Sequence, residues 1–149
     1  LQDLVATSET AFPLYVPSTP RYFIPGLKTE VKRSSQITLF FPSEVEREKA
    51  YLVINSSLMY WWWRVRDGGM TLSRETLLST PIPEFAVSDE IVKALEASEV
   101  DSKVYKVNAG VAQENVKHSE SLVVRVTESV VPGYAKQLKS THNNSDFIE

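Results

Sequence analysis

Apolar and aromatic residues in the first 42 positions occur in short runs separated by prolines and polar residues. Three runs, 11–16 (AFPLYV), 21–24 (RYFI) and 36–41 (QITLFF), are rich in the aromatic and β-branched residues that suit a pleated strand. Five of the eight prolines lie here, and because proline lacks a backbone donor, long helices are not expected. We therefore predict a small set of strands and loops over residues 1–42.

From residue 44 the apolar positions adopt a helical period. They recur at Ala50, Ile54, Leu58, Trp61 and Val65, which is the spacing of one helix face. Ser43 followed by Glu46 has the spacing of a capping box, and Asp67-Gly68-Gly69 is typical of a helix end. These signals predict one long helix over residues 44–66.

A second set of apolar residues falls on roughly the opposite side of this predicted helix, at Leu52, Met59 and Trp63. A helix that is apolar on two faces is usually buried on both. One face would pack on the N-terminal strands, and the other needs a cover, either from the C-terminal helices or from a partner. Leu52, Met59 and Trp63 are therefore the candidate partner-interface residues.

The remaining sequence contains shorter helical patterns. Thr71 and Ser73 are cap candidates for a short helix near residues 74–79, which Pro81-Ile82-Pro83 would end. A further helix is expected after Ser88, using Ile91, Val92, Leu95 and Val100, and a last helix from near Ser119, using Leu122, Val126 and Val130.

The polar stretch 108–118 between these two helices is interpreted as a loop. The chain as a whole is therefore expected to be α+β, with strands packed on a long central helix. Residues 1–87 would form this first part, and residues 88–149 a helical C-terminal segment.

Composition restricts the chemistry available to the chain. At 149 residues it holds one domain, and the absence of cysteine excludes a disulfide scaffold and a thiol nucleophile. His118 and His142 lie in polar segments without acidic partners at metal-ligand spacing, so both are expected at the surface and no metal site is predicted. No phosphate-binding glycine loop or nucleophile elbow is present, so independent catalysis is not expected.

The sequence gives no sign of membrane insertion. The uncharged stretch 50–63 is shorter than the roughly 20 residues that a bilayer span requires. The first residues lack the basic start and apolar run of a secretory signal, and a cytoplasmic location is expected.

Charge is distributed unevenly along the chain, whose formal net charge is -3. Residues 1–75 contain nine basic and eight acidic residues, whereas residues 76–149 contain seven and eleven. Lys32 and Arg33 are followed directly by the hydroxyls of Ser34 and Ser35. Cations and hydroxyls both bind phosphate oxygens, so this loop is a candidate DNA contact; the alternative is an ordinary solvated loop.

A second candidate surface follows the three consecutive tryptophans at 61–63. Its residues are Arg64, Arg66, Gly68, Gly69, Thr71 and Arg74. A turn that opens into a hydroxyl-rich helix start, with arginines beside it, could bind an anion, and the tryptophans could stack on bases. Alternatively, the tryptophans belong to the core and the arginines cap helix carbonyls.

Several motifs occur here in a recognisable order: Asn55-Ser56-Ser57-Leu58, Tyr60-Trp61-Trp62-Trp63-Arg64, Asp67-Gly68-Gly69, Thr71-Leu72 and Pro81-Ile82-Pro83. Together they resemble the region beyond the catalytic domain in bacterial adenine-specific N-6 DNA methyltransferases of restriction-modification systems, including type IIG fusions with an endonuclease. The resemblance covers most of residues 20–85.

The resemblance implies a non-catalytic piece of the target-recognition region that binds double-stranded DNA. The methylase catalytic domain, with its S-adenosylmethionine cofactor, would be the partner. Neither the Asn-Pro-Pro-Tyr catalytic signature nor the cofactor-binding glycine motif occurs in these residues, and Thr80 stands where the family often has Phe. The chain begins with Leu1, so a fragment of a larger enzyme is expected. The alternative is a structural module that docks on the catalytic domain without contacting bases.

Overall fold

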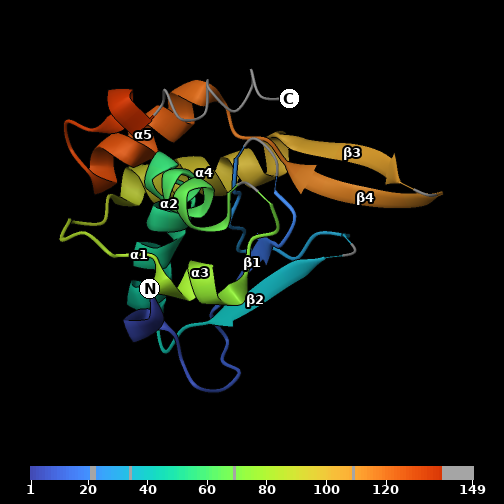
Figure 1. Cartoon of the computed structure of the whole chain (residues 1–149), viewed down its shortest axis with the longest axis horizontal. Coiled ribbons are helices and arrows are strands. Elements are labelled where there is room, and N and C mark those ends of the chain that lie inside the picture. Colours follow the sequence, from blue (N-terminus) through green and yellow to red (C-terminus); the bar gives the residue numbers. More distant parts are fainter. Residues whose placement is uncertain (21–22, 34, 69, 109, 139–149) are drawn as a thin grey trace.

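The structure is a computed structural model that describes residues 1–20, 23–33, 35–68, 70–108 and 110–138 (Figure 1). Its elements in chain order are a 3₁₀ turn η1 (Gln2–Leu4), β1 (Pro13–Pro17), β2 (Gln36–Phe40), α1 (Glu44–Ile54), α2 (Ser57–Asp67), α3 (Arg74–Ser79), α4 (Asp89–Asp101), β3 (Lys103–Asn108), β4 (Val111–Val116) and α5 (Glu120–Val130). Two separate antiparallel strand pairs accompany the helices, which confirms the α+β class.

The first strand pair lies beside α1 and forms one wall of the core. β1 and β2 are antiparallel, with Leu14 opposite Leu39 and Val16 opposite Ile37. Leu14, Val16 and Leu39 are fully buried. The strands predicted in 11–16 and 36–41 are thus confirmed, whereas residues 23–24 are not in a strand and residues 21–22 lie outside the described part.

The single long helix predicted over residues 44–66 is wrong, because the helix is interrupted at Asn55 and Ser56. Asn55 ends α1, and its Nδ2 donates to the carbonyls of Tyr51 and Gly26, both at 2.9 Å. Ser56 has an extended backbone and precedes α2. Asparagine and serine compete with helical hydrogen bonding through their own side chains, so this pair favours a helix boundary over a helix interior.

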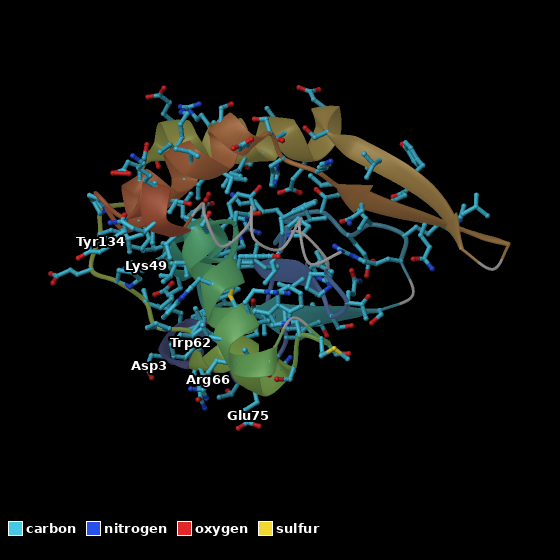
Figure 2. All side chains as sticks on the ribbon, turned by 45° about the horizontal axis from the view of Figure 1, so that its top comes forward. Asp3, Lys49, Trp62, Arg66, Glu75 and Tyr134 are labelled. Carbon is cyan, nitrogen blue, oxygen red and sulfur yellow. The ribbon has the colours of Figure 1, made fainter. Side chains whose placement is uncertain are left out.

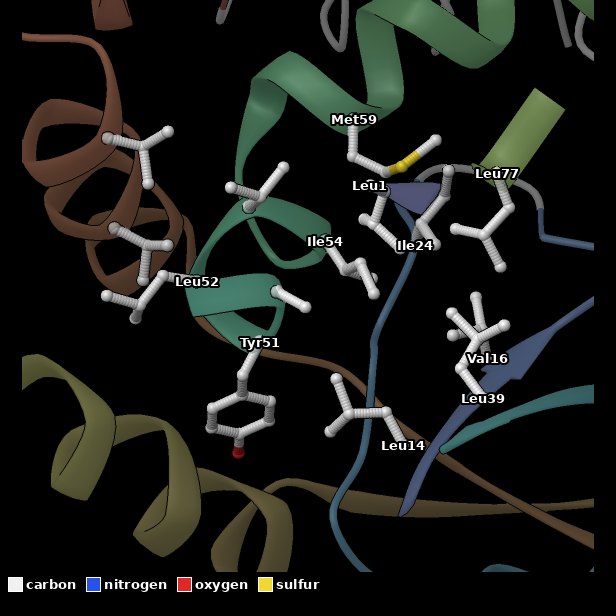
Figure 3. Close-up of a cluster of buried hydrophobic side chains, with 14 of the residues drawn as sticks. Leu1, Leu14, Val16, Ile24, Leu39, Tyr51, Leu52, Ile54, Met59 and Leu77 are labelled. Carbon is white, nitrogen blue, oxygen red and sulfur yellow. The ribbon is translucent and has the colours of Figure 1, made fainter. Parts of the chain in front are cut away.

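The core runs through both helices of this broken pair. In α1 the five consecutive residues from Ala50 to Ile54 have no exposed surface, so the second half of α1 is enclosed on every side. Figure 3 shows Ile54 and Met59 on the same side of these helices as Leu14 and Leu39, whereas Leu52 points to the other side, toward α5. The core also includes residues from beyond position 88: Val92, Leu95, Leu122, Val126 and Val130.

The last two helices begin where the sequence predicts. Ser88 and Ser119 accept hydrogen bonds from the backbone N–H groups of Ile91 and Leu122, which makes each serine a helix N-cap. Val100, however, is exposed rather than buried.

The loop predicted over residues 108–118 is wrong, because most of it belongs to a β-hairpin. β3 and β4 pair from Lys103 opposite Val116 to Asn108 opposite Val111. The hairpin extends away from the helices at one end of the molecule (Figure 1). Among the described residues, no helix is both long enough and apolar enough to cross a membrane.

Candidate nucleic-acid interface

The basic loop between β1 and β2 is held by its backbone. The carbonyl of Lys32 accepts a hydrogen bond from Glu114 N at 2.6 Å, and Lys32 N donates to Glu114 Oε2 at 3.3 Å. Glu114 lies on β4, so the loop is placed against the second hairpin. The side chain of Lys32 is exposed, and its charge remains available to a ligand.

Arg33 is oriented differently from Lys32. Its Nε donates to Gln36 Oε1 at 3.2 Å, and its terminal Nη1 and Nη2 atoms are buried without a hydrogen-bond partner among the described residues. Burial lowers the pKa of Arg33 to about 10, so the guanidinium remains charged at neutral pH. Arg33 therefore contributes positive potential, while Lys32 is the side chain that reaches solvent.

Ser35 connects this loop to the second candidate surface. Its hydroxyl contacts the hydroxyl of Ser18, and the carbonyl of Ser18 accepts a hydrogen bond from Leu72 N at 2.8 Å. Leu72 follows the exposed Thr71, a residue of the second surface. Two segments that are distant in sequence thus meet at Ser18. Ser34 and Gly69 lie outside the described residues.

Arg74 is attached to the same region. Its Nη1 donates to the carbonyl of Thr38 in β2 at 3.3 Å, and the side chain is exposed. A guanidinium carries five N–H donors, so this bond orients the group and leaves donors for an anion. Arg74 lies two residues after Leu72, and Lys32 lies three residues before Ser35, so each cation is close in sequence to one end of the Ser18 connection.

The turn after α2 is fixed by Asp67. Asp67 Oδ1 accepts from Thr76 Oγ1 at 2.8 Å and Oδ2 accepts from Ser73 N at 3.2 Å, so both oxygens are used within the turn. Gly68 has φ of 64°, a left-handed conformation that favours glycine. Because the Asp67 carboxylate is occupied, Ser73 and Thr76 serve the fold, and Ser73 is also the N-cap of α3.

Arg64 and Arg66 occupy the last turn of α2. The guanidinium of Arg66 lies over the ring of Trp62, with Cζ 5.0 Å from the ring centre, and Figure 2 shows both residues at the surface. Trp62 is fixed in turn by a 3.1 Å bond from its Nε1 to Ser79 Oγ. Arg64 is half-buried. Among the described residues, no hydrogen bond or ion pair joins the side chain of either arginine to Ser18.

The cations of the candidate surfaces are not neutralised by contacting carboxylates. Ion pairs among the described residues join Lys28 to Glu48 and Glu96, Lys103 to Glu114, and Arg125 to Glu90. None of them involves Lys32, Arg64, Arg66 or Arg74. Unpaired surface cations are the feature from which non-specific affinity for phosphates arises.

The residues proposed as a partner interface are core residues instead. Leu52, Met59 and Trp63 have no exposed surface within this chain, and the ring of Trp63 packs edge-on against Tyr60, with ring centres 5.6 Å apart. The three therefore offer no surface to a partner. The neighbouring Trp61, expected on the buried stripe, is the exposed tryptophan, because the break at Asn55 makes α1 and α2 separate helices.

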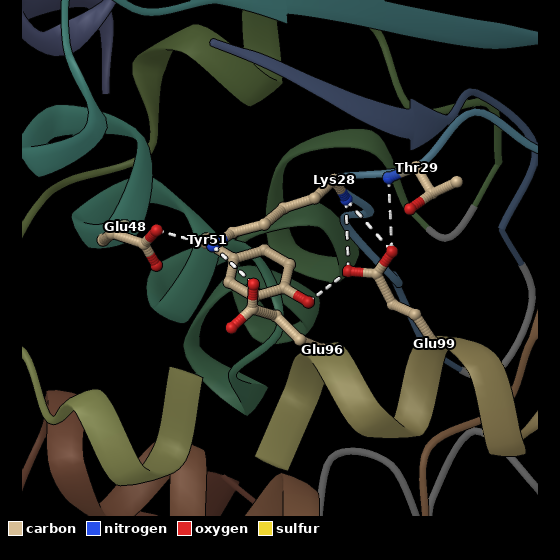
Figure 4. A network of polar contacts seen from close by, with 6 residues as sticks. All are labelled: Lys28, Thr29, Glu48, Tyr51, Glu96 and Glu99. Atoms are coloured by element: carbon tan, nitrogen blue, oxygen red, sulfur yellow. Dashed lines mark hydrogen bonds and ion pairs between the residues drawn. The ribbon is translucent and has the colours of Figure 1, made fainter. Parts of the chain in front are cut away.

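A buried polar cluster, which the sequence did not indicate, fixes Lys28 and Thr29 in the segment that leads to the basic loop (Figure 4). The carboxylate of Glu99 on α4 accepts hydrogen bonds from Lys28 N, Thr29 N and the hydroxyl of Tyr51. Lys28 Nζ pairs with Glu48 at 2.5 Å. Burial raises the pKa of Glu99 against the opposing effect of these hydrogen bonds. The cluster joins α1, α4 and the loop, three elements whose contact has no local sequence signal.

A groove of about 440 Å³ beside this cluster has the opposite charge to a DNA-binding surface. Its lining includes four carboxylates, from Glu44, Glu48, Asp89 and Glu96, against Lys28 and Lys93. Phosphates would be repelled from this side of α4.

The expectation that His118 is a solvated surface residue is also wrong. His118 is 7% exposed, and its Nδ1 lies 2.7 Å from Ser98 Oγ. Burial lowers its pKa to about 4, so the ring is neutral at pH 7. His142 lies outside the described residues.

Comparison of the chain with protein-family models, with curated proteins and with solved structures finds no match.

Proposed function

We propose that this chain is a non-catalytic DNA-recognition part of an adenine-specific DNA methyltransferase of a restriction-modification system. The observation that supports this most is the connection at Ser18, which contacts both Ser35, at the end of the basic loop, and Leu72, in the second candidate surface. Lys32 and Arg74 are exposed cations without a contacting carboxylate among the described residues, and the segments that carry them are connected through Ser18 and Thr38. A phosphate backbone is the ligand that such a surface suits.

In this proposal Lys32 and Arg74 set the position of the chain on duplex DNA, and Arg33 adds positive potential beside them. Contacts to phosphates fix register and orientation, whereas contacts to base edges supply sequence preference. The catalytic domain of the proposed parent would hold S-adenosylmethionine, receive the flipped adenine and transfer the methyl group. The chain needs no cofactor for its own part, and it would act in the cytoplasm, where a bacterial genome lies.

The test is a titration of the chain with a fluorescent duplex at several salt concentrations. The variant Lys32→Gln/Arg74→Gln is compared with Lys93→Gln/Lys136→Gln, which removes the same charge from exposed sites elsewhere. If Lys32 and Arg74 each neutralise one phosphate, their loss reduces the slope of log K against log salt by about 2. Equal slopes for the two double variants would contradict the proposal.

A module that docks on the catalytic domain is the second candidate function. Its surface would be the exposed face of α2, and not the buried residues Leu52, Met59 and Trp63. Trp61 is 37% exposed and Val65 is 61% exposed, and their spacing places both on one face of α2. A methylase catalytic domain could cover this face. The variant Trp61→Gln/Val65→Gln would then lose co-elution with that domain while its salt-dependent DNA binding stayed unchanged.

A further inference from the structure

The β3–β4 hairpin is an arm with an anchored base. At the base, Val116 is buried against Leu27 and Val31, and Glu114 N donates to the carbonyl of Lys32. Beyond this point the two strands continue in register to Asn108 and Val111, and Figures 1 and 2 show them extending past the helices. The arm therefore starts at the basic loop and projects into solvent.

The arm exposes apolar side chains that a solvated hairpin does not need. Tyr105 is 73% exposed and Val107 is 72% exposed, and strand alternation places both on one face. Val104, on the other face, is 43% exposed. An isolated two-stranded hairpin gains little stability of its own in water, so such residues indicate a surface that another molecule covers.

Charge identifies the kind of molecule that fits. The arm, residues 103–116, contains two lysines and one glutamate, whereas α4, directly before the arm, contains five carboxylates and one lysine. The positive arm is thus continuous with Lys32, and the acidic helix carries the groove that phosphates would avoid. The sign of the charge favours a polyanion over an acidic protein surface.

We propose that the β3–β4 arm enters the major groove of duplex DNA and that Tyr105 and Val107 contact base edges there. This inference rests on the proposed function. The major groove, about 12 Å wide, admits a two-stranded β-ribbon, and apolar side chains can contact the methyl group of thymine. Lys32, at the base of the arm, would reach the adjoining phosphates. The arm would therefore supply sequence preference, and the loop would supply affinity.

The experiment begins with selection of a preferred sequence from a pool of randomised 30-base-pair duplexes by the unaltered chain. Binding to the selected duplex and to the unselected pool is then measured by fluorescence anisotropy for two variants. One is Tyr105→Ala/Val107→Ala. The other replaces residues 107–112 by Asn-Gly, which shortens the arm by whole residue pairs and retains Glu114 and Val116 at its base.

The control is Val100→Ala, which removes an equally exposed valine from α4. We expect both arm variants to bind the selected duplex about tenfold more weakly while binding to the unselected pool changes less than about threefold. Methyl green, which occupies the major groove, should compete with the unaltered chain, and distamycin, which occupies the minor groove, should not.

Other outcomes separate the two proposals. If the chain binds DNA and the arm variants retain the full preference, the inference about the arm fails and the proposed function stands. Competition by distamycin and not by methyl green would also overturn the inference about the arm. Arm variants that lose only self-association would overturn it too, because the arm would then be a contact between two copies of the chain. If the unaltered chain binds duplex DNA but selects no sequence, the inference about the arm fails. If it binds no duplex at all, the proposed function fails as well.

Discussion

The side chain of Asn55 pairs with both backbone groups of Gly26. Asn55 Oδ1 accepts from Gly26 N at 3.1 Å, and Asn55 Nδ2 donates to Gly26 O at 2.9 Å. The approach is close enough that a Cβ on Gly26 would lie 2.7 Å from Ile54 Cγ2. Asn55 therefore ends α1 and at the same time attaches the segment that leads to the basic loop.

Replacement of Asn55 by Ala should lower the free energy of unfolding by about 3 kcal/mol, because it leaves the buried backbone N–H and carbonyl of Gly26 without partners. Urea unfolding followed by far-ultraviolet circular dichroism measures this. Thr71→Ala, at an exposed position, is the control and should change stability by less than about 0.5 kcal/mol. A similarly small effect of Asn55→Ala would show that the pairing does not stabilise the fold.

Truncation of Trp63 and of Trp61 should reduce stability by very different amounts. Trp63 is fully buried and Trp61 is 37% exposed. Trp63→Ala should cost about 3–5 kcal/mol, the range for loss of a buried aromatic side chain, whereas Trp61→Ala should cost less than about 1 kcal/mol. Urea denaturation curves of the two variants test the position of α2 directly. The unbroken helix predicted from sequence would bury Trp61, and Trp61→Ala would then also be strongly destabilising.

Local signals in the sequence were sufficient for elements whose ends are determined within a few residues. Ser73, Ser88 and Ser119 each cap a helix through a backbone N–H three residues later, and the sequence predicts all three helices from a cap residue followed by a helical pattern. The β1 and β2 strands followed from their aromatic and β-branched residues.

The remaining features depend on distant partners. The break at Asn55 is completed by Gly26, and the exposure of Trp61 follows from that break. The hairpin has no local signal, because β4 contains the polar run Gln113, Glu114, Asn115, which is typical of a loop. Its pairing with β3 and the backbone bond to Lys32 place it in a strand. In the candidate site, the residue types were found from sequence, but the connection at Ser18 and the burial of Arg33 required the fold.

His118 should make stability depend on acidity. Its pKa is about 4 in the folded chain and near the ordinary 6.5 when unfolded, so between these values the unfolded chain binds more protons. Stability should therefore be full above pH 6.5 and fall as the pH is lowered toward 4, by up to about 3 kcal/mol.

Comparison with His118→Gln isolates this contribution, because glutamine does not titrate and can still bond to Ser98. Urea unfolding at pH 4.5, 5.5 and 7.0 should show a steeper pH dependence for the unaltered chain than for the variant. Parallel curves would mean that the ring protonates in the folded chain as readily as in water, and a proton-detected titration of His118 would then give an ordinary pKa.

Glu99 should contribute a pH dependence of opposite sign. Its folded pKa is raised by burial above the ordinary 4.5, so in the interval above 4.5 the folded chain binds more protons than the unfolded chain. Stability from this group is therefore greatest below pH 4.5 and decreases as the pH rises through the folded pKa.

Glu99→Gln imitates the protonated form and keeps an oxygen for Lys28 N and the Tyr51 hydroxyl. The variant should thus gain stability relative to the unaltered chain as the pH is raised from 4.5 to 7, whereas Glu90→Gln, at an exposed carboxylate, should show no such trend. If Glu99→Gln instead lost stability relative to the unaltered chain over this interval, the hydrogen bonds from Lys28, Thr29 and Tyr51 would outweigh burial, and the direction of the pKa shift would be reversed.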